Sequence, residues 1–123
     1  MRKRILVIDD EEPIRETLRL GLEPEGYEVV TAADGPEGLE RFADGAGWDL
    51  VLLDQRMPEM DGLEVLQRLR AANRSVPVML LTAHGSIELT GKSLASGARG
   101  FLTKPISLRS LREVVRKALE PVK

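Results

Sequence analysis

Short apolar runs alternate with segments of helical periodicity along the whole chain. The apolar runs cover residues 5–8, 29–30, 50–53, 76–81 and 101–102. Continuous runs of this kind are typical of strands that are buried on both faces of a parallel sheet. Between them, apolar residues recur every three or four positions, as Ile14, Leu18 and Leu22 do. This spacing predicts amphipathic helices between the strands.

Cap and turn residues support the same segmentation. Candidate helix N-caps are Asp34 and Asp61, each with a capping-box glutamate three residues later (Glu37 and Glu64), followed by Ser86 and Ser107. Candidate left-handed residues after helices are Gly26, Asn73 and Gly97. The predicted elements are strand 4–9, helix 11–23, strand 28–32, helix 35–44, strand 49–54, helix 62–72, strand 76–82, helix 86–96, strand 99–103 and helix 107–119.

Strict alternation of strands and helices predicts an α/β fold. We expect a single doubly wound (βα)5 domain, with five parallel strands, helices on both faces and right-handed crossovers. The 123 residues are the usual size of one domain. Residues 1–123 are therefore expected to form one domain, which either stands alone or is part of a longer protein.

Composition narrows the possible functions. The chain has no cysteine, which excludes disulfides and thiolate metal sites and fits a cytoplasmic location. Its formal charge is −2, from 18 basic and 20 acidic residues, so we expect no direct binding to nucleic acid and no membrane association. No apolar run approaches the roughly 18 residues that a membrane span requires.

Five polar residues follow the predicted strands directly. Asp9 and Asp10 end the first strand, Asp54 the third, Thr82 the fourth and Lys104 the fifth. Ligands of doubly wound folds bind beyond the carboxyl ends of the strands, so these side chains are expected to meet. Taken singly, each has a simpler reading: acids cap helices, a threonine ends a strand, and Lys-Pro is a common loop dipeptide. All five at one edge favour a functional site.

The chemistry of this set indicates phosphoryl transfer. Three neighbouring carboxylates repel each other unless a cation neutralises them. Mg²⁺ suits such a site, since it takes carboxylate oxygens, retains waters and binds phosphate. A carboxylate can also act as a nucleophile and form an aspartyl phosphate, whose oxygens Thr82 and Lys104 are placed to bind.

The same positions resemble the motifs of bacterial response-regulator receiver domains, the CheY-like family. The resemblance rests on residues 8–10 (IDD), 52–62 (LLDQRMPEMDG), 81–83 (LTA) and 101–105 (FLTKP), in order along the whole chain. It implies a flavodoxin-like sheet with the strand order 2-1-3-4-5. It also implies that the protein is a phosphoacceptor switch of a two-component phosphorelay.

Site roles follow from the resemblance, residue by residue. Asp54 matches the phosphoacceptor, Asp10 a direct Mg²⁺ ligand, and Asp9 an acid that binds the metal mainly through water. The backbone carbonyl of Arg56 matches a further metal ligand, so Asp9, Asp10, Asp54 and Arg56 form the implied metal site. No cofactor besides Mg²⁺ is implied.

The resemblance also implies a switch. Thr82 matches the switch hydroxyl, Lys104 the phosphate-binding lysine, and Phe101 the aromatic switch position; the alternative is that Phe101 is only a core residue. The Lys104–Pro105 bond matches a position that is usually cis. Phosphorylation would then change the face formed by the fourth helix, the fifth strand and the fifth helix.

Partners follow from the same resemblance. A sensor histidine kinase or a phosphotransfer protein would supply the phosphoryl group, and an output domain or a second copy would read the changed face. Such a domain catalyses only its own phosphorylation and dephosphorylation, so it is otherwise not an enzyme.

Three other functions compete with this one. A flavodoxin-like cofactor binder shares the fold, but acidic residues 9–12 would repel a flavin phosphate. A hydrolase with an aspartyl nucleophile would need a second acid where Arg56 stands. A degenerate receiver that only docks partners would lack some of the reactive groups, which are all present.

Helix 86–96 is weak by composition. Gly91 lies in its interior and costs about 1 kcal/mol relative to alanine. We expect this helix to be the mobile output element. The alternative is that Gly91 allows close packing.

Overall fold

The computed structural model describes residues 2–44, 47–73, 75–83, 91–92 and 94–120. Within them, five parallel strands form one sheet of order β2-β1-β3-β4-β5, which confirms the predicted architecture and strand order. The strands are β1 Arg4–Ile8, β2 Glu28–Ala32, β3 Leu50–Asp54, β4 Val78–Thr82 and β5 Gly100–Thr103. The helices are α1 Glu12–Leu22, α2 Gly35–Asp44, α3 Gly62–Ala72 and α5 Leu108–Ala118, with a short 3₁₀ turn at Glu23–Glu25.

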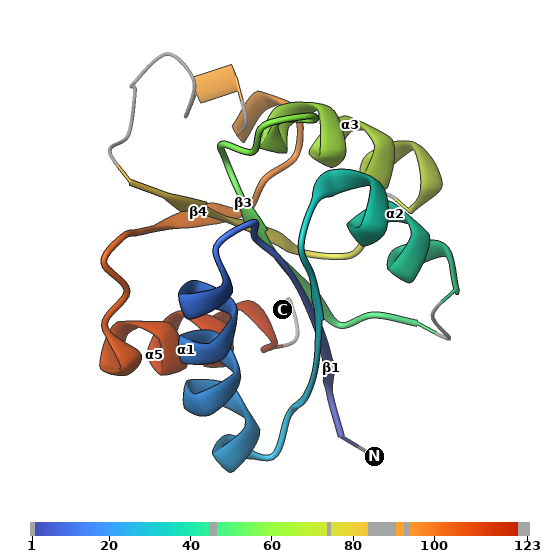
Figure 1. The fold of residues 1–123 in the computed structure, drawn as a ribbon. Helices are drawn as coiled ribbons and strands as arrows, with labels where there is room; N and C mark the ends of the chain where they lie inside the picture. The colour runs from blue at the N-terminus through green and yellow to red at the C-terminus, as the bar shows by residue number, and fades with distance from the viewer. Residues whose placement is uncertain (1, 45–46, 74, 84–90, 93, 121–123) are drawn as a thin grey trace.

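Helices cover both faces of the sheet (Figure 1). Helices α1 and α5 lie together on one face, and α2 and α3 lie on the other. The first face packs Leu18 and Leu22 of α1 with Leu111 and Val115 of α5. The opposite core receives the α3 residues Val65, Leu66 and Leu69. The central strands β3 and β4 are buried along their whole length, as their continuous apolar runs predict.

Most predicted boundaries agree with the structure to within one residue. Strand β4 begins at Val78 instead of 76, because Pro77 has no N–H for the ladder and serves only as an acceptor, from Val51 N at 3.0 Å. Helix α1 stops at Leu22, and Pro24 lies in the 3₁₀ turn that follows.

The predicted caps are mostly confirmed. Asp34 accepts from Glu37 N at 2.7 Å while Glu37 accepts from Ala33 N at 2.6 Å. Ser107 accepts from Ser110 N at 3.3 Å. The Asp61 box is half formed: Asp61 accepts from Glu64 N at 3.0 Å, but the Glu64 carboxylate pairs with Arg68 at 2.8 Å.

A left-handed backbone conformation is found at two of the three predicted positions. Gly26 and Gly97 have φ values of 96° and 107°, as predicted. The prediction for Asn73 is wrong, because its φ of −155° and ψ of 113° are extended. Its side chain instead accepts from the backbone N–H of Ser75 at 2.9 Å, so it organises the following turn.

The predicted helix 86–96 falls largely outside the described residues. Residues 91–92 and 94–95 are helical, whereas the predicted N-cap Ser86 lies outside the described residues. Among the described residues, a Cβ added at Gly91 would meet nothing within 4 Å, which gives the close-packing interpretation no support. The low stability of this helix stays a prediction.

Candidate functional site

The carboxyl ends of four strands meet at one edge of the sheet. Asp9 follows β1, Asp54 ends β3, Thr82 ends β4 and Lys104 follows β5. Backbone hydrogen bonds place these ends: Asp9 N donates to Ala32 O at 3.1 Å, and Lys104 N donates to Thr82 O at 2.6 Å. The predicted convergence of the five polar residues is thus what the parallel register produces.

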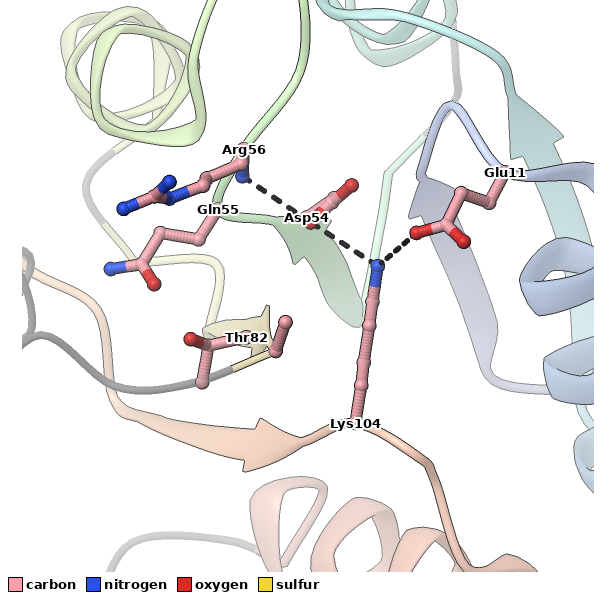
Figure 2. Close-up of a pocket in the computed structure, with 7 residues that line it drawn as sticks. Glu11, Asp54, Gln55, Arg56, Thr82 and Lys104 are labelled. Atoms are coloured by element: carbon pink, nitrogen blue, oxygen red, sulfur yellow. Dashed lines mark hydrogen bonds and ion pairs between the residues drawn. The ribbon is translucent and has the colours of Figure 1, made fainter.

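Lys104 occupies the centre of the site (Figure 2). Its ammonium lies 3.0 Å from Asp9 Oδ2, 3.1 Å from Glu11 Oε1 and 3.4 Å from Asp54 Oδ1. The side chain is only 11% exposed, so these charges interact with little solvent screening. Burial alone would lower the pKa of Lys104, but the contacts with Asp9 and Glu11 and the charge of Asp54 outweigh it and raise this pKa. The ammonium therefore stays protonated throughout the neutral range.

Four acidic side chains surround a common point. Oxygens of Asp9, Asp10, Glu11 and Asp54 lie within 4.8 Å of one another. Asp9 and Asp54 are buried, while Asp10 and Glu11 are exposed. Asp10 and Asp54 were predicted as metal ligands, with Asp9 beside them. Glu11 was not predicted, because an acid at the start of a helix is usually explained as a cap.

The buried carboxyl groups resist ionisation. Burial, followed by the charge of Asp9, raises the pKa of Asp54 to about 7, although Lys104 and the Arg56 N–H oppose this change. Burial also raises the pKa of Asp9, against the bonds from Glu11 N and Lys104. The single ammonium of Lys104 is thus insufficient to neutralise the cluster.

The donor set fits a hard divalent cation. Asp9 Oδ1 accepts from Glu11 N at 2.8 Å. Asp9 Oδ2 is buried and accepts no hydrogen bond of good geometry from the described residues, although the Lys104 ammonium is near. A buried carboxylate oxygen that is held by an ion pair but by no well-aligned hydrogen bond, within an all-oxygen acidic cluster, matches the ligand preference of Mg²⁺.

A cleft of about 230 Å³ opens beside Asp54. It is lined by Glu11, Asp54, Gln55, Arg56, Thr82, Ala83 and Lys104. Arg56 N donates to Asp54 Oδ1 at 3.3 Å. Ala83 adds only a methyl group to the lining. Gln55 was not predicted as a site residue. The available signal was a second polar side chain directly after Asp54, at the end of a buried strand.

Phe101 and Pro105 complete the comparison with the predicted site. Phe101 lies on β5 and is 44% exposed, so the alternative that it is a core residue is wrong. The Lys104–Pro105 peptide bond is cis, as the resemblance implied.

Known proteins share both this sequence pattern and this fold. The sequence model of the response regulator receiver domain matches residues 5–116. A transcriptional regulatory protein of Bacillus subtilis (strain 168), YkoG, described as uncharacterized, is 46% identical over 115 residues, which are 94% of this chain and 50% of that protein. The response regulator MprA of Mycobacterium ulcerans (strain Agy99) is 41% identical over 123 residues, covering 100% of this chain and 53% of that protein.

The structural comparison agrees. The chemotaxis protein CheY4 of Vibrio cholerae superimposes with a TM-score of 0.92 at 32% identity, covering 97% of this chain and 100% of that chain. The chain belongs to the response regulator receiver domain family of two-component systems. It spans about half the length of the curated relatives described above. No helix in the described part of the chain is long and apolar enough to cross a membrane.

Proposed function

We propose that this domain is a phosphoacceptor switch in which Asp54 receives a phosphoryl group from a histidine kinase or a phosphotransfer protein. The supporting observation is the buried Asp54 carboxylate at a cleft mouth, 3.4 Å from the Lys104 ammonium and within the acidic cluster. A nucleophile, a fixed cation and an acidic metal-type cluster are the parts that phosphoryl transfer to a carboxylate requires.

Mg²⁺ is the proposed cofactor. Asp9, Asp10 and Asp54, with the Arg56 carbonyl, would hold it, and the bound ion would neutralise the carboxylates and the charge of the phosphoryl oxygens. Within this charge environment, a carboxylate oxygen of Asp54 attacks phosphorus. The bond from phosphorus to the donor imidazole nitrogen breaks, and its electron pair stays on that nitrogen. Lys104 and Thr82 bind phosphoryl oxygens.

The output face is proposed to include β5 and α5 with the helix before β5. Among the described residues of this region, the large apolar side chains of Leu94 and Phe101 are 45% and 44% exposed. Exposed large apolar side chains on these elements support a protein partner. An output domain or a second copy of the chain would bind here, with Thr82 and Phe101 coupling the face to Asp54. A cytoplasmic location, with no direct contact to nucleic acid or membrane, belongs to the same proposal.

Incubation with acetyl phosphate tests the proposed function. In the presence of MgCl₂, intact mass spectrometry of the wild type is expected to show one added phosphoryl group that hydroxylamine removes. A chelator and the Asp54→Asn substitution should each abolish the adduct, because one removes the cation and the other the nucleophile. A wild-type protein that gains no phosphoryl group would contradict the proposal, as would an equal adduct on Asp54→Asn.

The acidic cluster leads to a separate prediction for Glu11. Glu11→Gln is expected to weaken Mg²⁺ binding about fivefold, since one charge several ångströms from the ion contributes about 1 kcal/mol in a solvated setting. Titration calorimetry with MgCl₂ measures this effect. Glu12→Gln is the matched control, because Glu12 is the next exposed acid but lies outside the cluster. Equal affinities of the two variants would show that Glu11 does not act on the metal site.

A further inference from the structure

Gln55 is a buried residue that carries an amide side chain. It follows β3 directly, and only 4% of its surface is exposed. Its backbone is fully engaged, with N donating to Leu81 O at 2.9 Å and O accepting from Gly62 N at 3.0 Å. Its carboxamide, however, forms no hydrogen bond with any residue in the described part of the chain. Among the described residues, Asp9 Oδ2 is the one fully enclosed side-chain polar atom without a partner, so the Gln55 carboxamide remains accessible from the cleft.

The unpartnered carboxamide lines the cleft beside Asp54. Figure 2 shows its side chain extending from the end of β3 on the Thr82 side of the cleft, whereas Lys104 and Glu11 lie on the other side of Asp54. The β3–β4 register ends at the pair of Asp54 and Leu81, and Gln55 N donates to Leu81 O at 2.9 Å, so the residues that follow, Gln55 and Thr82, leave the sheet next to each other.

Thr82, like Gln55, is a buried residue whose polar side-chain group has no partner among the described residues. It is 3% exposed, and its hydroxyl has no hydrogen-bond partner among the described residues. One wall of the cleft therefore carries two neutral polar groups that have no partner among the described residues and are open to a ligand. The opposite wall carries the ammonium of Lys104, which already contacts three carboxylates.

The neutral wall formed by Gln55 and Thr82 determines which ligand can bind there. A carboxamide has two N–H donors and a threonine hydroxyl has one. Such donors form their strongest hydrogen bonds with anionic oxygens. A divalent cation would not need the amide, since Asp9, Asp10 and Glu11 already offer it carboxylate oxygens. Oxygen atoms of a tetrahedral anion at Asp54 would satisfy both neutral groups.

We propose that Gln55 is an additional oxyanion-binding residue, whose carboxamide donates a hydrogen bond, next to the Thr82 hydroxyl, to the tetrahedral group carried by Asp54. This inference rests on the proposed function, because the phosphoryl group is that tetrahedral group. Gln55 would then help to determine how tightly the phosphorylated state is held, without touching the attacking oxygen.

Beryllofluoride binding tests the role of Gln55. This tetrahedral anion coordinates a carboxylate oxygen and resembles a phosphoryl group. With MgCl₂ present, titration calorimetry and ¹⁹F NMR are expected to show binding to the wild type. Gln55→Met keeps the side-chain volume but removes the donor, and we expect about tenfold weaker binding, as for one hydrogen bond to a charged group. Met57→Leu is the matched control, a buried apolar exchange in the same loop that is expected to bind as the wild type does.

The possible outcomes separate the two proposals. A wild type that binds no beryllofluoride and gains no phosphoryl group overturns the proposed function and, with it, the role of Gln55. A wild type and a Gln55→Met variant that bind equally well overturn the role of Gln55 alone. If Gln55→Met does not fold, beryllofluoride binding to Gln55→Glu tests the role of Gln55 instead. A carboxylate there removes the donor and repels the anion, so unchanged affinity of this variant at pH 8 would also overturn the inference.

Discussion

Asp54→Asn is expected to stabilise the metal-free domain by about 2 to 4 kcal/mol at pH 8. In the folded wild type, burial and the charge of Asp9 raise the pKa of Asp54 from 3.8 to about 7. A difference of about three units between the folded and unfolded states corresponds to about 4 kcal/mol, and relaxation around the site reduces this value. Asparagine has the same shape but no charge, so this penalty disappears in the variant.

The sign of the pH dependence follows from proton linkage. Between pH 3.8 and 7, the folded state holds a proton on Asp54 that the unfolded state has lost. The free energy of unfolding of the wild type therefore falls as pH rises through this window. Below pH 3.8 both states are protonated, so the advantage of Asp54→Asn should vanish there.

Urea unfolding in the presence of a chelator, at pH 4 and pH 8, measures this difference. Asp44→Asn is a suitable control, since Asp44 is an exposed carboxylate at the end of α2 and its loss should change stability by less than about 0.5 kcal/mol. Added Mg²⁺ is expected to stabilise the wild type more than Asp54→Asn, because the ion offsets the repulsion that the substitution removes. An advantage of the variant that is equal at both pH values would refute the electrostatic explanation.

Gly62→Ala is expected to destabilise the domain by about 3 kcal/mol. Gly62 begins α3 and is buried. A Cβ at this position would lie 2.5 Å from Asp54 O and 2.8 Å from Gln55 Cα. Both atoms belong to the backbone at the end of β3, which cannot rotate away as a side chain does. The loop must therefore shift, at the upper end of the cost of overpacking.

Thermal and urea unfolding of Gly62→Ala give this cost, and the acetyl phosphate reaction shows its effect on the site. Because the shift displaces the carbonyl of Asp54 itself, phosphorylation should also slow. Gly91→Ala is the matched control: its new Cβ meets none of the described residues within 4 Å, and alanine favours the helix by about 1 kcal/mol. A Gly62→Ala variant as stable as Gly91→Ala would show that the loop after Asp54 adapts freely.

The sequence alone predicted the fold class and most of the elements. Apolar runs such as 50–53 can only be buried on both faces, which requires a parallel sheet between helices. The predicted boundary was wrong where a single residue interrupts the strand pairing, as Pro77 does before the start of β4. The prediction of a left-handed backbone at Asn73 was wrong, because its backbone is extended and its side chain organises the next turn. The strand order came from the family resemblance, since alternation alone allows several orders.

The list of polar residues at strand ends was also available from the sequence, because parallel strands deliver their carboxyl ends to one edge. Which of these residues contact one another could not be predicted from the sequence. Only the folded chain brings Glu11 within 3.1 Å of the Lys104 ammonium, 93 positions away. Burial likewise depends on every neighbouring element, so the raised pKa of Asp54 and the unpartnered amide of Gln55 are properties of the tertiary structure. Residue order decides which groups reach the edge of the sheet, whereas packing decides how far water is excluded from them and hence how strongly they interact.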